Sequence, residues 1–109
     1  MIYEFELCHG RHDTPASMAI FPHDVDPTNM ESMRIMADRS IPNDATLIKV
    51  FVTGLTPAIL SVIEVCLERR IALIAFHYDR TTGDYIQQIV VGGPVISQLR
   101  LADKVLNLI

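Results

Sequence analysis

The sequence predicts a single small α/β domain, residues 1–109, with a mixed, mostly parallel sheet of about four strands and flanking helices. Two nearly continuous apolar, β-branched runs, 47–52 and 71–76, have the composition of strands buried on both faces. A helix-sized amphipathic segment separates them, so the two strands should be parallel with a right-handed crossover. The chain has 109 residues, of which 50% are hydrophobic and 20% charged, which supports one packed core and excludes disorder.

The N-terminal segment alternates apolar and polar residues over 2–8, which predicts a strand with one wetter face. Residues 9–15 are too polar and turn-rich to continue that strand. Residues 19–21 are a candidate for a short extended piece that ends at Pro22.

A helix is expected to begin near Thr28, because Thr28 and Glu31 have the spacing of a capping box. It should run to about Arg39, and the segment around Pro42 should stop it. Its inward face is predicted to carry Met30, Met33, Met36 and Ala37.

The central unit is the most clearly determined part of the sequence. After the strand 47–52, Thr56 is predicted to cap a helix that has Pro57 at its first position. This helix should reach Arg70 and lead into the strand 71–76. Its apolar stripe is Ile59, Val62, Ile63, Cys66 and Leu67.

The C-terminal part should form a hairpin and a last helix. Residues 79–84 make a turn in which Gly83 can adopt positive φ, and 85–91 return antiparallel. An apolar stripe from Val95 to Ile109 predicts a helix. The expected order is therefore β-α-β-α-β-β-α.

Charge and composition exclude several classes of function. The net charge is −4 and no basic stripe is present, which argues against duplex DNA or long RNA but not against a small anion held by arginines and amides. No apolar run reaches the ~18 residues of a membrane span. The acidic N-terminal residues are unlike a signal peptide, so a cytoplasmic protein is expected. Cys8 and Cys66 match no zinc or CxxC pattern and should be reduced core thiols.

Ligands of open parallel sheets bind at the carboxyl ends of the strands. Residues 53–56 and 77–80 follow the two central strands there. If strand 2–8 is also parallel to them, residues 9–12 join the same edge. Predicted ligand-binding residues are His9, Arg11, His12, Thr53, Gly54, Leu55, Thr56, Tyr78 and Arg80.

Each of these segments has a chemical interpretation and a plainer structural one. The turn at Gly54 could present helix amides to a phosphate, or be an ordinary capped strand-to-helix turn. His77, with Asp79 nearby, could act as a general acid or base, or be a core histidine. Tyr78 could stack on a base or finish the core, and Arg80 could grip a phosphate or be a solvated turn residue.

Metal binding is not expected. His9, His12 and Asp13 could coordinate an ion, but they have no characteristic ligand spacing and Arg11 would oppose a cation. No cofactor motif is present either, and GxGxxG and Walker sequences are absent.

The stretch 50–88 resembles the core of the small CRISPR-associated Csx-type proteins, which bind or degrade cyclic oligoadenylates. The matching features are the turn 53–57, the helix after it, the strand ending in Tyr78 and Asp79, and a returning strand with Gln87 and Gln88. The whole chain, including 8–12 and 52–56, is also similar to small phage and prophage proteins.

The resemblance implies that residues 54–57 and 78–80 contact phosphates and riboses, and that the chain forms a homodimer or higher homo-oligomer with the ring on a two-fold axis. Ring-degrading members use a histidine near the end of the helix, where this chain has Arg69 and Arg70. His77, His9 or His12 would have to replace it.

Three functions follow from these observations. The favoured one is a sponge or sensor that binds a cyclic nucleotide messenger, such as cyclic oligoadenylate, in antiviral defence or phage counter-defence (an anti-CRISPR role). The second is a ring nuclease, a metal-independent phosphodiesterase that cleaves this messenger, with His77 and Asp79 as catalytic residues. The third is a phage or host interaction module that binds no nucleotide and uses the C-terminal helix.

Overall fold

The computed structural model describes residues 1–11 and 13–92, so His12 and the predicted helix over 95–109 lie outside the described residues. Seven elements follow one another along the chain: β1 (Ile2–Cys8), β2 (Ala19–Phe21), α1 (Met30–Ser40), β3 (Leu47–Phe51), α2 (Thr56–Arg69), β4 (Ala72–Asp79) and β5 (Asp84–Val91).

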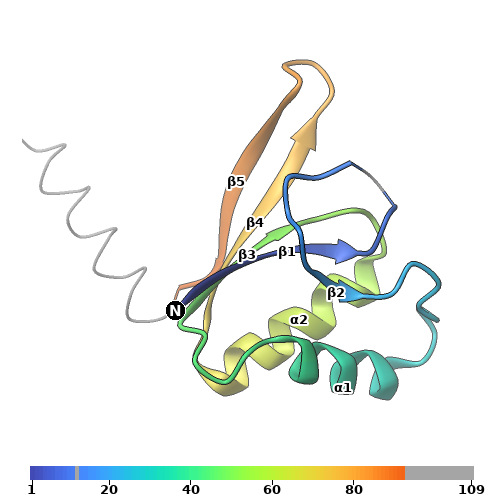
Figure 1. Cartoon of the computed structure of the whole chain (residues 1–109), viewed down its shortest axis with the longest axis vertical. Helices are drawn as coiled ribbons and strands as arrows, with labels where there is room; N and C mark the ends of the chain where they lie inside the picture. The colour runs from blue at the N-terminus through green and yellow to red at the C-terminus, as the bar shows by residue number, and fades with distance from the viewer. Residues whose placement is uncertain (12, 93–109) are drawn as a thin grey trace, which may run out of the picture.

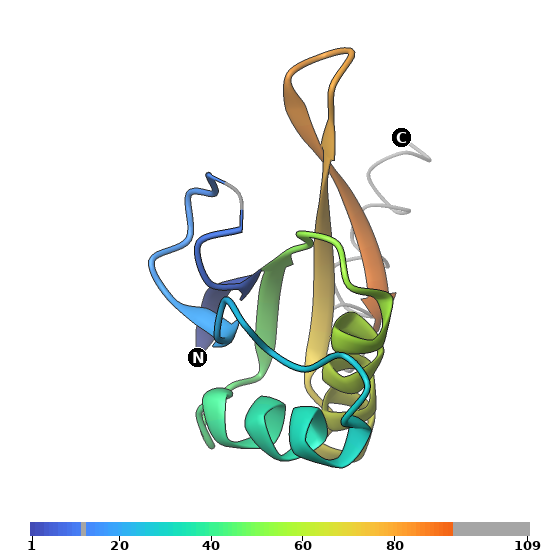
Figure 2. The same ribbon diagram turned by 90° about the vertical axis from the view of Figure 1, so that its right-hand side faces the viewer.

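The strands form one sheet in the order β2-β1-β3-β4-β5 (Figure 1). The first four are parallel and β5 is antiparallel to β4, which confirms the predicted mostly parallel α/β domain. The sheet has five strands rather than about four, because residues 19–21 do form an edge strand. Figures 1 and 2 show α1 and α2 together on one side of the sheet.

The central β3–α2–β4 unit forms as the apolar runs predict. Register pairs Leu47 with Ala72 and Phe51 with Phe76. Ile48, Val50 and Leu73 are fully buried in the main core beneath the helices. Burial on this scale is the dominant stabilising contribution in a domain of this size.

The start of α1 differs from the predicted capping box. Asn29 is the N-cap, and its side-chain oxygen accepts from the Ser32 amide at 3.1 Å. Thr28 instead donates to the Asp26 carboxylate through its amide (2.9 Å) and hydroxyl (2.6 Å), which keeps it out of the cap. Of the predicted inward face, Met33 and Ala37 are buried and Met36 packs against the core. Met30, the first residue of the helix, is exposed.

The start of α2 also differs by one residue. Leu55 is the N-cap, with left-handed φ of 46° and no side-chain cap, and Thr56 is already helical. The reason is that Gly54 (φ 91°) and Leu55 complete the turn before Thr56 is reached. Leu67, assigned to the buried stripe, is exposed. It is near the C-terminal end of the helix, where Arg70 in left-handed conformation ends α2.

The β4–β5 hairpin projects beyond the rest of the sheet (Figures 1 and 2). β3 ends at Phe51, opposite Phe76, while β4 continues to Asp79. The turn closes as predicted, with Gly83 at φ 74° and its amide donating to the Asp79 carbonyl at 2.9 Å. No helix among the described residues is long and apolar enough to cross a membrane.

Candidate functional site

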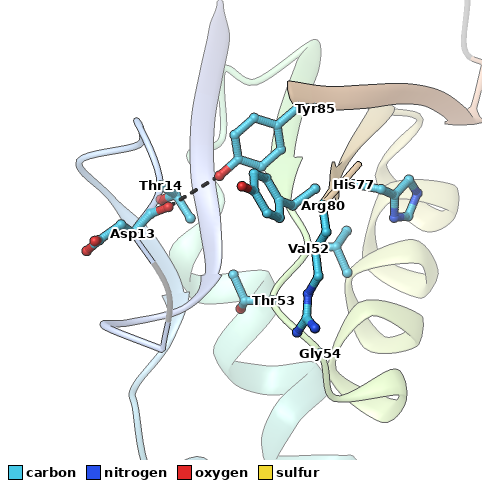
Figure 3. A pocket seen from close by; sticks show the side chains of 9 residues that line it. Asp13, Thr14, Val52, Thr53, Gly54, His77, Arg80 and Tyr85 are labelled. Atoms are coloured by element: carbon cyan, nitrogen blue, oxygen red, sulfur yellow. Dashed lines mark hydrogen bonds between the residues drawn. The ribbon is translucent and has the colours of Figure 1, made fainter. Parts of the chain in front are cut away.

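A pocket of about 550 Å³ opens at the carboxyl edge of the sheet, beside the base of the projecting hairpin (Figure 3). It joins three segments: the loop after β1, the loop after β3, and the hairpin. Its lining residues are Asp13, Thr14, Val52, Thr53, Gly54, His77, Tyr78, Arg80 and Tyr85. The volume is within the ~300–1,000 Å³ typical of small-molecule sites.

Five of the predicted site residues line this one pocket: Thr53, Gly54, His77, Tyr78 and Arg80. The parallel pairing of β3 with β4 brings them together, because both strands end at the same edge. The parallel pairing of β1 with β3 adds the loop after β1 as a further wall.

The other predicted residues lie outside the lining. Leu55 packs against the core, and Thr56 is an exposed first residue of α2. His9 and Arg11 are exposed in the loop after β1, which contributes Asp13 and Thr14 instead. His12 lies outside the described residues.

Gly54 provides an open stretch of backbone. Its φ of 91° is a backbone conformation that residues other than glycine rarely adopt. Apart from its chain neighbours, no atom lies within 4 Å of the position that a Cβ would occupy. The neighbouring Thr53 is buried and accepts from the Cys8 amide at 3.4 Å, which ties the ends of β1 and β3 together. A ligand can therefore approach the Gly54 backbone closely while Thr53 remains fixed.

An aromatic ladder leads from the sheet to the pocket. Phe76 stacks on Phe51 with centroids 4.9 Å apart, and Phe51 meets Tyr85 edge-on at the same distance. Tyr85 meets Tyr78 at 5.6 Å. Tyr78 is 57% exposed, so it ends the ladder with a ring that has room for a planar partner.

His77 lies at the pocket on the other side of β4 from Tyr78, because successive strand residues face opposite ways. Figure 3 shows its ring turned toward α2. Its Nε2 is 2.8 Å from the Gln88 side-chain oxygen. With that oxygen as acceptor, Nε2 carries the proton and Nδ1 is the basic nitrogen.

Asp79 holds the hairpin tip. Its carboxylate accepts from the Thr81 amide at 3.0 Å and from the Thr82 hydroxyl at 3.1 Å. These contacts order the chain next to Arg80, whose guanidinium points toward the loop at Gly54 in Figure 3. Asp79 thus supports the pocket without lining it.

The role of Glu6 was not predicted, because the alternation of residues 2–8 places it on the wetter face of its strand. Glu6 is buried, and its carboxylate accepts from the Gly10 amide (3.2 Å) and the Thr14 hydroxyl (3.1 Å), with His9 Nδ1 at 3.2 Å. It therefore organises the loop that forms one pocket wall. No local motif marks such a contact, because the alternation of β1 is the same for an exposed and a buried acid.

Tyr85 was also missed as a site residue. It faces Tyr78 across the hairpin, and its hydroxyl donates to the Asp13 carbonyl at 3.3 Å, which links the hairpin to the loop after β1 (Figure 3). The signal was available: a turn over 79–84 places residues 78 and 85 opposite each other.

Neither cysteine is suited to be a nucleophile. Both are free and buried, as expected. Burial raises the pKa of the Cys8 thiol and raises that of Cys66 to about 12, which keeps both protonated near neutral pH. Within residues 1–11 and 13–92, no three acidic, histidine or cysteine side chains are close enough together to hold a metal ion.

The C-terminal end of α2 has a structural role. Arg69 donates to the carbonyl oxygens of Ile41 (3.0 Å) and Pro42 (2.6 Å) and so fastens the loop after α1 to α2. It lies at the opposite end of α2 from the pocket.

Comparisons with known protein families, with curated proteins and with solved structures find no match to this chain.

Proposed function

We propose that the pocket binds one nucleotide unit of a cyclic nucleotide messenger, and that the chain acts as a sponge or sensor for it in prokaryotic antiviral defence or phage counter-defence. The observation that carries this proposal is that a cation, an open glycine backbone and an exposed aromatic ring line one pocket: Arg80, Gly54 and Tyr78.

Each of these groups suits one part of a nucleotide. The Arg80 guanidinium can form paired hydrogen bonds with a phosphate. The Gly54 turn precedes α2, a helix of 14 residues whose N-terminal dipole end favours an anion. Tyr78 offers its face to a base, and stacking on an aromatic ring contributes about 1–3 kcal/mol per base.

The choice of cyclic oligoadenylate rests on the resemblance described above, since stacking does not distinguish one base from another. The pocket is sized for a single small ligand, so we propose that the remainder of the ring extends beyond it. The net charge of −4 fits a site that holds a small anion locally, without the basic surface that a long phosphate backbone requires.

A second candidate function, a ring nuclease, is favoured by the presence of His77 in the lining. In that reaction a ribose would have to lie on the α2-facing side of β4 (Figure 3), where the basic Nδ1 would take the proton of its 2′-hydroxyl as that oxygen attacks the adjacent phosphorus. The bond to the 5′-oxygen would break, giving a 2′,3′-cyclic phosphate and a 5′-hydroxyl that takes up a proton. No metal is required, because positioning and charge stabilisation supply the rate. The third candidate, a protein-interaction module, depends on residues 95–109, outside the described part of the chain.

Native mass spectrometry with cyclic di-, tri-, tetra- and hexanucleotides tests the proposal. We expect the wild-type protein to retain an intact ring. Arg80→Ala and Tyr78→Ala should each raise the dissociation constant of the ring at least about tenfold, which corresponds to the loss of ~1.4 kcal/mol of binding free energy. Arg39→Ala is the matched control, since Arg39 is exposed in the last turn of α1 and lines no part of the pocket.

The other outcomes separate the candidates. A linear product that disappears in His77→Asn would make the protein a ring nuclease. A wild-type protein that neither retains a ring nor gives a linear product would refute both nucleotide functions and leave the interaction module. Equal loss in Arg39→Ala and Arg80→Ala would show that binding does not occur in this pocket.

A further inference from the structure

The two edges of the sheet are protected to very different degrees. β2 has only three residues and is followed by Pro22, which cannot donate a backbone hydrogen bond, so this edge offers little to another strand. β5 has eight residues, and no described strand pairs with its outer side. Among the described residues, the sheet therefore has one blunted edge and one long edge open to pairing.

The side chains of β5 favour pairing rather than prevent it. Exposed edge strands usually carry lysine, other charges or proline, which block association. β5 has one charged residue, Asp84, at its very start, and residues 85–91 are uncharged. Ile86 is 56% exposed and Val90 36% exposed, so the edge presents apolar surface together with free backbone groups.

We propose that β5 pairs antiparallel with β5 of a second copy of this chain, so that the sheet continues across a two-fold axis. An antiparallel pair of identical strands is self-complementary, as a two-fold interface requires. Pairing centred on Gln88, the middle of the uncharged run, brings Ile86 beside Val90 of the partner in both directions, at the point where the register shift between β4 and β5 leaves Val90 without a partner in β4. It also keeps the two Asp84 carboxylates at opposite ends of the ladder.

This pairing also gives the projecting hairpin a neighbour. An isolated two-stranded hairpin is marginally stable, and here the hairpin extends beyond β3 from His77 onward. In the proposed register, residues 84–86 of one copy lie beside residues 90–92 of the other. The projection becomes part of a wider sheet.

The dimer has a consequence for the pocket, although it does not rest on the proposed function. Tyr85 lines the pocket at the start of β5. Antiparallel pairing therefore puts the two pockets at opposite ends of the joined strands. Each chain would bind its own ligand, which differs from the ring on a shared axis that the resemblance implies.

Sedimentation velocity of the full chain over a range of micromolar concentrations is the test. We expect a dimer, and Ile86→Lys and Val90→Lys should each raise its dissociation constant at least about tenfold by introducing a charge at the edge. Met30→Lys is the control, because Met30 is 55% exposed on α1, away from β5, and the dimer should persist. A wild-type monomer over this concentration range would overturn the proposal.

Oxidative cross-linking then tests the register. Gln88→Cys should give a disulfide-linked dimer, whereas Asp84→Cys should not, and the buried Cys8 and Cys66 should not contribute in the folded protein. A dimer that survives both edge lysines, or one that cross-links through residue 84 instead of 88, would refute the β5–β5 interface even though a dimer exists.

Discussion

Removing the buried carboxylate of Glu6 should destabilise the protein through the loop after β1. In Glu6→Ala, the Gly10 amide and the Thr14 hydroxyl lose the acceptor that they contact at 3.2 and 3.1 Å. A hydrogen bond to a charged group contributes roughly 1.5–3 kcal/mol when shielded. Both donors are at the surface of a loop and regain water, so we take about 1 kcal/mol each. The third contact adds little, because the His9 side chain is 75% exposed.

The expected loss is therefore about 2 kcal/mol in the free energy of unfolding, measured by urea denaturation followed by circular dichroism. Glu4→Ala is the matched control: Glu4 is an exposed acid on the same strand, two residues earlier, and should change stability by less than about 0.5 kcal/mol. Glu6→Gln keeps one acceptor and should fall between the two. The reasoning is refuted if Glu6→Ala and Glu4→Ala are equally mild.

Three further predictions concern the core and the turn before α2. Burial raises the pKa of the Cys66 thiol from 9.0 to about 12, so the unfolded chain loses this proton at a lower pH than the folded chain does. The free energy of unfolding should therefore fall between pH 9 and 12, by up to about 1.4 kcal/mol per pH unit. If a Cys66→Ala variant kept the full decline, the burial of Cys66 would not be its cause. Gly54→Ala should lower the free energy of unfolding by about 1–2 kcal/mol through the φ of 91° alone. Gly92 has equally open space around it and no positive φ, so Gly92→Ala should be nearly neutral in the same urea titration. Phe51→Ala should lower the free energy of unfolding by about 3 kcal/mol, because Phe51 is 5% exposed and contacts two other rings. Leu67→Ala should lower it by less than about 0.5 kcal/mol, because Leu67 is 62% exposed. Similar urea midpoints for these two variants would contradict the assigned core.

The fold was predictable where a local pattern and the tertiary structure demand the same residues. The runs at 47–52 and 71–76 are apolar because side chains on both faces of the central strands are buried, such as Ile48 on one face and Leu47 on the other, and a parallel β-α-β unit buries them. The helix starts were less predictable. Thr28 and Thr56 each have the right chemistry for a cap, but Asn29 and the turn at Gly54 and Leu55 determine where the helices begin.

The candidate site was predictable in its location and incompletely in its composition. Parallel strands end at one edge, so Thr53, Gly54, His77, Tyr78 and Arg80 could be expected to meet there, and they line one pocket. Strand alternation, however, places His77 and Tyr78 on different sides of β4, and the carboxylate of Asp79 is used by the turn. Of the two residues that order the loop after β1 or join it to the hairpin, Glu6 carries no sequence signal of its own, whereas Tyr85 could have been expected from the turn over 79–84, which places it opposite Tyr78.

The sequence by itself determined the central β-α-β unit with the hairpin after it, the buried strands and the edge at which a ligand site can form, because these follow from periodicity and from the geometry of parallel pairing. Only the tertiary structure decided which polar side chains serve the fold and which face the pocket. A carboxylate such as Glu6 is buried when donors from a distant part of the loop reach it, and that depends on where the folded backbone places Gly10 and Thr14. The same holds for β5, which is an edge strand of the described sheet only because β4 pairs on its other side.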